Sequence, residues 1–168
     1  MRLRIPYHSQ KTDYLCGPAV LQMVFSYFKK FKPQDKLAKD LKTSRKTGTH
    51  HREMIRVARE NGFHCLAKEN SSLHEIKHFI DKKLPVIVYY LEPDTEEDHI
   101  AIVSGYSEKS LIFHDPWNGK DFRLSNSVFL NRWHDHFEGK AYRRWMMVIS
   151  KKDFNLGKKY PSARAPAD

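Results

Sequence analysis

Cys16 stands directly before an apolar stretch, in the segment "YLCGPAVLQMVFSYF", where a helix is expected to begin. A cysteine attacks as its thiolate, and the free backbone amides and the dipole at a helix N-terminus favour that negative form. Cys16 is therefore a candidate nucleophile. A lone cysteine at a helix start is more often a small buried residue, so this interpretation needs support from other parts of the chain.

A histidine and an aspartate further along the chain have the types and spacing that a thiol nucleophile needs. The segment "DHIAIVSGYSEKSLIFHDP" predicts two antiparallel strands joined by a tight turn over 107–109. His99 begins the first strand and Asp115 ends the second, so the pairing brings the two side chains together. A thiol nucleophile requires such a base, and a third group that holds the imidazole in its useful tautomer.

Gln10, shortly before the cysteine, is a candidate donor to a developing negative charge. Its side-chain N–H can point at the oxygen that becomes negative when a thiolate attacks an acyl carbon, together with the backbone N–H of Cys16. Loss of such a donor typically lowers the rate by about 10²–10³. An enzyme of this kind is therefore expected to need Gln10.

Five carboxylates precede His99 in the run "EPDTEEDH", residues 92–99. Their field favours the imidazolium form of His99, and a cleft edged by them favours a cationic or amine-bearing substrate. Asp98 in this run, and Trp117 just after Asp115, are the candidate substrate-binding residues. The alternatives are a solvated loop for the run and simple packing for Trp117.

The order of these residues resembles that of a known family. A glutamine, a Cys-Gly pair at a helix start, and later "DHIAIVSGY" and "DP" are similar to the papain-like bacteriocin-processing peptidases, which include the exporter peptidase domains that remove double-glycine leaders. The resemblance covers nearly the whole chain, including the segment "GTHHREMIRVARENGF". It implies that Cys16 is the nucleophile, His99 the base, Asp115 the orienting acid and Gln10 the oxyanion donor.

The resemblance also implies a mechanism and a substrate class. The thiolate attacks a peptide or related acyl carbonyl, the imidazolium protonates the leaving amine, and water releases the acyl enzyme without a metal or organic cofactor. The substrate is then a peptide or protein, such as a leader peptide. Exporter domains commonly carry an aspartate directly before the nucleophile, whereas this sequence has Leu15 there and Asp13 two positions further back. The chain therefore looks like a free-standing relative.

Length and charge set limits on the remaining possibilities. The 168 residues fit one domain over 1–156 with a basic, flexible tail over 157–168. The net charge of +10 predicts attraction to polyanions, but the basic residues are scattered without interleaved surface aromatics, so a nucleic-acid partner is not expected. The sequence has neither a secretory signal nor an apolar run long enough to cross a bilayer, so a cytoplasmic location is expected.

The second cysteine and the histidine clusters predict no metal site. Only two cysteines occur, without CxxC spacing, so both are expected to be free thiols, with Cys65 buried in a strand. The histidines within 50–51 and 134–136 lack a partner cluster, so we expect them at the surface or at helix caps rather than around a metal ion.

Helices are predicted in the first half of the chain and strands mostly in the second. Apolar periodicity and capping signals predict helices over 17–31, 32–44, 48–63, 71–84 and 126–133. Alternating or continuous apolar runs predict strands over 63–69, 85–93, 99–107, 110–117 and 143–150. This order indicates an α+β, papain-like fold in which N-terminal helices pack on a C-terminal antiparallel sheet.

Two other functions stay open at this point. An acyl or aminoacyl transferase would use the same three residues with an amine in place of water as the acceptor. A non-catalytic domain of the same fold would bind a peptide or a polyanion without turnover. The presence of all four expected positions favours an enzyme, and most simply a peptidase.

Overall fold

The computed structural model describes residues 1–154 and the backbone of residues 159–160. The elements follow in the order α1 (Cys16–Tyr27), α2 (Gln34–Asp40), α3 (His51–Glu60), β1 (His64–Lys68), α4 (Leu73–Asp81), β2 (Val86–Leu91), β3 (Asp98–Tyr106), β4 (Ser110–Asp115), β5 (Gly119–Ser125), α5 (Asn126–Arg132), β6 (His134–Phe137), β7 (Lys140–Arg143), β8 (Met146–Ser150) and β9 (Lys159–Tyr160).

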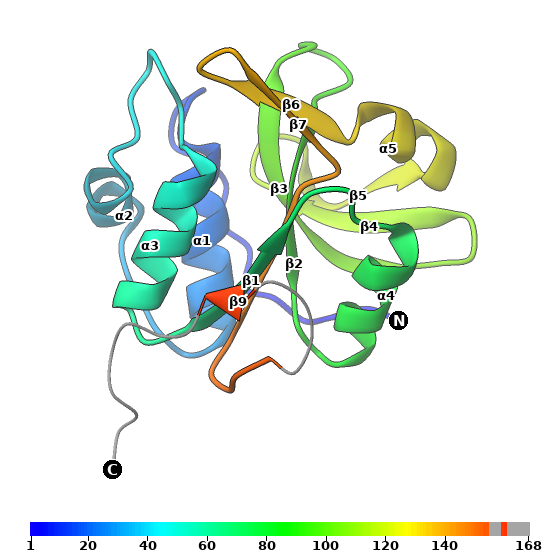
Figure 1. The fold of residues 1–168 in the computed structure, drawn as a ribbon, viewed down its shortest axis with the longest axis horizontal. Coiled ribbons are helices and arrows are strands. Elements are labelled where there is room, and N and C mark those ends of the chain that lie inside the picture. The colour runs from blue at the N-terminus through cyan, green and yellow to red at the C-terminus, as the bar shows by residue number, and fades with distance from the viewer. Residues whose placement is uncertain (155–158, 161–168) are drawn as a thin grey trace.

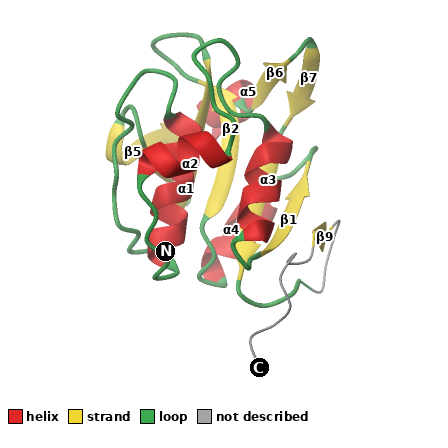
Figure 2. Cartoon of the chain, turned by 90° about the vertical axis from the view of Figure 1, so that its left-hand side faces the viewer, coloured by secondary structure: helices red, strands yellow, loops and turns green. Residues whose placement is uncertain are grey.

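Helices α1, α2 and α3 form one layer and a seven-stranded sheet forms the other (Figure 1). The strand order is β5-β4-β3-β2-β8-β1-β9, and each neighbouring pair is antiparallel. Figure 2 looks at the molecule from the helical side, with these three helices in front of the sheet. The predicted α+β arrangement of N-terminal helices on an antiparallel sheet is therefore confirmed.

Helix α1 is the central helix of the fold. Ten of its 12 residues are buried, because it is apolar on most sides and packs against both α2 and the sheet. The helix ends at Tyr27 rather than at residue 31 as predicted. Lys29 adopts a left-handed backbone with φ 63°, and the amide of Lys30 closes the helix on the carbonyl of Phe25. Phe31 consequently lies outside the helix and is 75% exposed.

The predicted strands are present, but the sequence did not predict β5, β6, β7 or β9. Strand β5 is a polar strand with little buried surface, and the β6–β7 hairpin is short and polar, so neither shows a clear apolar alternation. The hairpin turns at Glu138 and Gly139, which both have positive φ, without the Asn-Gly or Asp-Gly pair that usually marks such a turn.

The C-terminal part of the chain is described only in part. Most of the tail predicted over 157–168 lies outside the described residues. The two described residues within it, Lys159–Tyr160, form β9, which pairs with β1.

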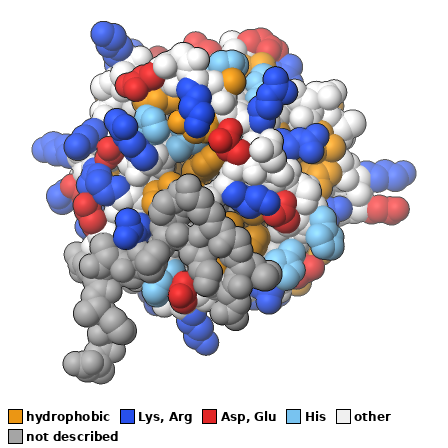
Figure 3. Space-filling model, viewed as in Figure 1, with side chains coloured by type: hydrophobic (Ala, Val, Ile, Leu, Met, Phe, Trp, Pro, Cys, Tyr) orange, Lys and Arg blue, Asp and Glu red, His pale blue; other side chains and the backbone are white. Residues whose placement is uncertain are grey.

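Charged side chains are mixed on the face of the molecule drawn in Figure 3. Lys and Arg alternate there with Asp and Glu and do not gather into a single basic patch. Ion pairs at the surface of the described chain include Lys36 with Asp40 and Arg56 with Glu60. Exposed pairs of this kind contribute little to stability.

Gly17 allows α1 to approach the segment before α3 closely. A Cβ atom at this position would lie 2.3 Å from Oγ1 of Thr49, well inside van der Waals contact. Thr49 is itself held by two hydrogen bonds, because its hydroxyl bonds that of Thr43 and its carbonyl accepts from the hydroxyl of Tyr89. The glycine therefore sets the depth at which Cys16, the preceding residue, enters the fold.

Gly17→Ala is expected to lower the free energy of unfolding by about 1–3 kcal/mol, because the added methyl overpacks the contact with Thr49. Urea denaturation followed by far-UV circular dichroism measures this as a lower midpoint at an unchanged slope. An unchanged midpoint would mean that the start of α1 can shift freely, contrary to this account.

Candidate active site

Cys16 is the first residue of α1 and is 9% exposed. The residue before it, Leu15, makes no side-chain capping bond, and the first turn of the helix contains no acidic residue. The backbone amides of a first helical turn have no partners within the helix. Their partial positive charge is therefore free to act on the sulfur of Cys16 or on a ligand beside it.

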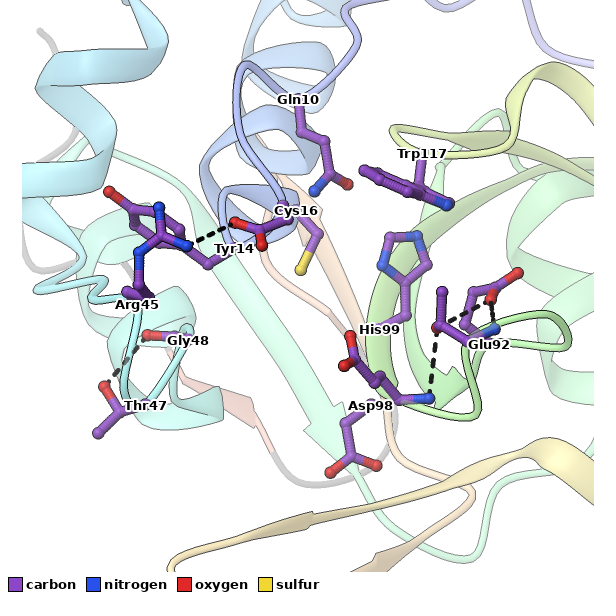
Figure 4. Close-up of a pocket in the computed structure, with 13 residues that line it drawn as sticks. Gln10, Tyr14, Cys16, Arg45, Thr47, Gly48, Glu92, Asp98, His99 and Trp117 are labelled. Carbon is purple, nitrogen blue, oxygen red and sulfur yellow. Dashed lines mark hydrogen bonds and ion pairs between the residues drawn. The ribbon is translucent and has the colours of Figure 1, made fainter.

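His99 and Asp115 lie side by side, as the predicted strand pair requires. His99 is the second residue of β3 and Asp115 is the last residue of β4. Nε2 of His99 donates to Oδ1 of Asp115 at 2.8 Å, and both side chains are buried. This bond leaves Nδ1 of His99 for the thiol, and Figure 4 shows the sulfur of Cys16 in the same cleft as the imidazole.

Asp115 is fully buried and accepts hydrogen bonds on both oxygens. Oδ1 also accepts from the backbone amides of Trp117 and Asn118, and Oδ2 accepts from the hydroxyl of Tyr90 at 2.6 Å. Burial raises the pKa of Asp115, but the hydrogen bond and charge of His99 and the other donors outweigh it, so that its pKa is lowered overall. The carboxylate is therefore held in its charged form.

The environment of His99 stabilises its charged form as well. Burial lowers the pKa of His99, but hydrogen bonds to Asp115 and Cys16, together with their charges, raise it to about 10. At neutral pH the imidazole is then an imidazolium between a carboxylate and a sulfur. This is the charge state in which a cysteine nucleophile is paired with its acid.

Gln10 lies at the same cavity as Cys16, although its side chain is already partly engaged. Its Nε2 donates to the carbonyl of Thr12 at 2.7 Å, which occupies one of the two N–H groups of the amide. Its backbone amide donates to the carbonyl of Pro116, so the N-terminal segment is tied to the loop after β4. Gln10 is therefore held beside the cleft with one donor remaining.

All six residues singled out as site candidates are near one another. Five of them line a cavity of about 220 Å³, and Asp115 lies behind His99. The lining consists of Gln10, Asp13, Tyr14, Cys16, Arg45, Thr47, Gly48, Glu92, Thr95, Glu97, Asp98, His99 and Trp117. Figure 4 places Gln10 and Trp117 at one end of this cleft and Asp98 at the other, with His99 between them.

The sequence reading missed two residues that support Asp115. Tyr90 was part of a continuous apolar strand, where an aromatic ring suggested packing, although a buried tyrosine hydroxyl generally needs a partner. Asn118 donates its backbone amide to Asp115 and its side-chain amide to Glu92, and so links the loops that follow β2 and β4. The sequence contains one signal for the role of Asn118, which is a polar residue directly after the segment "HDPW".

The expected surface or capping role for the other histidines is only partly correct. His50 caps α3, since its Nδ1 accepts from the amide of Arg52. His51 is instead buried, sandwiched between the rings of Tyr89 and Tyr142, with its Nε2 2.9 Å from a carboxylate oxygen of the buried Asp135. That prediction was wrong for His51, because aromatic stacking and the contact with the carboxylate of Asp135 compensate for its burial.

Among the described residues, no group of three or more His, Cys, Asp or Glu side chains is arranged to hold a metal ion. The buried pair of His51 and Asp135 in particular has no third ligand of these types. Cys65, as predicted, is a buried strand residue in β1, and both cysteines are free thiols.

The raised pKa of His99 gives the protein a stability that depends on pH. The charged imidazole stabilises the fold fully below about pH 6.5, which is the pKa of a histidine in an unfolded chain. This stabilisation is lost as the pH rises toward about 10, the raised pKa of His99 in the folded protein. We expect the free energy of unfolding to fall between about pH 6.5 and 8.5, by up to about 1.4 kcal/mol per pH unit.

Urea denaturation at several pH values in this window, on the wild type and on His99→Gln, measures the effect. The window ends at about pH 8.5 because burial raises the pKa of Cys65 to about 12, which adds a similar loss at higher pH. The variant should show a flatter dependence. An equal slope in both proteins would assign the pH dependence to other groups.

Solved structures with the same fold include peptidase domains of transporters. The peptidase domain of Streptococcus ComA, described as a bi-functional ABC transporter involved in a quorum-sensing pathway, has a TM-score of 0.69 and 23% identity, covering 86% of this chain and 97% of that chain. A double glycine motif protease from an AMS/PCAT transporter, in complex with the leader peptide, has a TM-score of 0.68 and 22% identity, covering 88% and 92%.

A putative C39-like peptidase from Bacillus anthracis is similar at a TM-score of 0.69 and 14% identity, covering 89% of this chain and 96% of that chain. At these identities the likeness shows the fold alone. It is the papain-like fold of C39 peptidases, as predicted.

None of the described helices is both long enough and apolar enough to span a membrane. No curated protein matches the sequence. The family model described as "Peptidase_C39 like family" matches residues 2–139, which is most of the chain and includes every candidate site residue. Family and fold together support a cysteine peptidase-like function, and the chain belongs to the peptidase C39-like family.

Proposed function

We propose that this protein is a cysteine peptidase that hydrolyses a peptide or related amide bond with Cys16 as nucleophile. The observation that carries the proposal is the position of His99, whose imidazole lies between the buried carboxylate of Asp115 and the sulfur of Cys16. A buried histidine paired on both sides in this way is poised to exchange a proton with a substrate bound at the sulfur.

The reaction proceeds in two halves. The thiolate of Cys16 adds to the carbonyl carbon, and a tetrahedral intermediate forms whose oxygen carries the negative charge. The imidazolium of His99 gives its proton to the leaving amine as the C–N bond breaks, which leaves a thioester. Water then gives a proton to His99 and adds to the thioester, and collapse releases the carboxylic acid product and the thiolate. Asp115 positions the imidazole throughout.

Two donors are available for the oxyanion. One is the backbone amide of Cys16 in the first turn of α1, and the other is the N–H of Gln10 that is not bonded to Thr12. Because α1 points its N-terminus at this position, its dipole favours the same negative charge.

The proposed substrate is a peptide or protein segment that lies along the cleft past Cys16, in contact with Asp98 and Trp117. A leader peptide is one such substrate, since the AMS/PCAT protease of the same fold was solved with a leader peptide. The cytoplasmic location that the sequence analysis predicts would suit this chemistry, because a reducing compartment keeps the nucleophile as a free thiol.

Cys16→Ala is expected to abolish cleavage, and Gln10→Ala to lower kcat by about 10²–10³ through loss of an oxyanion donor. Incubation with a mixture of synthetic leader-like and unrelated peptides, followed by mass spectrometry of newly formed termini, measures this. Cys65→Ala is the matched control, because it removes a buried thiol outside the cleft and should leave cleavage intact. Cleavage that persists in Cys16→Ala would refute the proposal.

The same experiment separates hydrolysis from acyl transfer. With isotopically labelled water, a hydrolase incorporates the label into the new carboxyl group. With an added amine acceptor, an acyl or aminoacyl transferase instead yields a product whose mass is larger by the acceptor. A binding domain without turnover would give neither product.

Iodoacetamide should alkylate Cys16 and spare Cys65 in the folded protein. Cys16 borders the cavity, where the reagent can reach its sulfur, whereas Cys65 is buried and its burial raises the pKa of the thiol to about 12. Peptide mapping after short exposures below pH 8 should show one modified cysteine, and His99→Ala should slow the reaction. Equal labelling of both cysteines would indicate ordinary thiols and would favour a binding domain.

A further inference from the structure

Most charged groups around the catalytic cleft are neutralised by partners within the protein. Asp13 and Arg45 pair with each other across one wall, and Arg45 also lies over the ring of Tyr14. Glu92 is buried, and its carboxylate accepts from the amides of Asp94 and Thr95, the hydroxyl of Thr95 and the side chain of Asn118. The hydrogen-bonding capacity of Glu92 is therefore used within the protein, and Asp13 and Arg45 offset each other's charge.

The acidic run before His99 separates into three carboxylates that line the cleft, one of them Glu92, and two that do not, Asp94 and Glu96. Glu96 points away, where it forms a bidentate pair with Arg132 outside the cavity. Glu97 and Asp98 line the cavity, and neither forms an ion pair with a Lys or Arg in the part of the chain that the structure describes. The run thus presents two carboxylates without a described Lys or Arg partner, Glu97 and Asp98, beside the proposed catalytic histidine.

Asp98 is exposed, and no Lys or Arg of the described chain pairs with it. Its Oδ2 accepts from the backbone amide of His136 at 3.2 Å. Partial burial and the charge of the nearby Asp135 raise the pKa of Asp98, whereas this hydrogen bond and the charges of His136 and His134 lower it, so that its pKa is raised overall. A cation from outside would stabilise the charged form of this carboxylate.

The carboxylates of Glu97 and Asp98 differ in their pairing from acidic side chains on the rest of the molecule. The chain has 30 Lys and Arg against 20 Asp and Glu, a net charge of +10, so cations are plentiful elsewhere on the surface. Acidic side chains away from the cleft commonly have such a partner, as Asp35 has Lys11 and Asp121 has Arg2. Unpaired carboxylates at the catalytic cleft of a strongly basic protein favour a positively charged ligand and repel an acidic one.

From this charge distribution we infer that the end of the cleft beside Glu97 and Asp98 binds a positively charged side chain of the peptide substrate, a lysine or an arginine. The inference rests on the proposed function and names the substrate class. Figure 4 shows Asp98 on the opposite side of His99 from Gln10 and Trp117, so the cationic residue lies at the end of the cleft away from the oxyanion donor.

Binding to the inactive Cys16→Ala protein tests this without requiring turnover. The probes are short fluorescent alanine-based peptides, each of which carries one lysine at a different position along the chain. Each has a matched peptide in which norleucine replaces the lysine. At one or two positions the lysine peptide should bind about 5- to 10-fold more tightly by fluorescence anisotropy, and the difference should shrink as salt is added.

Matched variants of the acidic run test which carboxylates cause the preference for lysine. Glu97→Gln, and Asp98→Asn with an oxygen retained for the amide of His136, should each reduce the preference for lysine, and Glu97→Lys should reverse it toward glutamate peptides. Glu96→Gln removes the same unit of charge from the same loop but outside the cavity, so it should keep the preference.

Three results would overturn the inference: equal binding of lysine and norleucine peptides or no measurable binding of either, a preference that survives the Glu97 and Asp98 variants, or a preference lost equally in Glu96→Gln. None of these bears on whether the wild type cleaves a neutral peptide through Cys16. Failure of the inference and failure of the proposed function are therefore distinguishable.

Discussion

The hydrogen bond between His99 and Asp115 is the interaction on which the arrangement of the cleft depends. A fully buried carboxylate is costly unless donors surround it, and Asp115 has a ring nitrogen, two backbone amides and a tyrosine hydroxyl. Those donors come from β2, β3 and the loop after β4. The hydrogen bonds that surround this one carboxylate therefore fix three segments relative to each other. They also hold the imidazole of His99 in place.

The second half of the site is built independently on the helical layer. Cys16 begins α1, and the depth of that helix is set by the close contact between Gly17 and Thr49. The N-terminal segment joins the two halves, because the backbone amide of Gln10 bonds the carbonyl of Pro116 beside Trp117. The N-terminus of a helix and the ends of two interior strands, β3 and β4, thus meet across a small cavity. The helix supplies partial positive charge there, and β3 supplies a charged imidazole.

The sequence predicted the parts of this arrangement that follow from local chemistry. Antiparallel pairing of 99–107 with 110–117 follows from the turn between them, and so His99 and Asp115 were expected together. Proximity of Cys16 to His99 depends on packing between layers, which no local pattern encodes, and it was suggested only by resemblance to a family. The polar strand β5 and the β6–β7 hairpin were missed because they lack apolar alternation. The buried pair of His51 and Asp135 was missed because its burial depends on Tyr89 and Tyr142, from distant strands.

The division of the site between two layers affects how activity responds to mild perturbation. The sulfur of Cys16 belongs to the helical layer, whereas the imidazole of His99 belongs to the sheet. Only non-covalent packing sets the distance between the sulfur and the imidazole. A catalytic step at a thiol requires this distance to be correct to well under about an ångström. Small sliding between helix and sheet would therefore abolish the proposed peptidase activity while each layer stays intact, so loss of that activity should precede loss of secondary structure as denaturant is added.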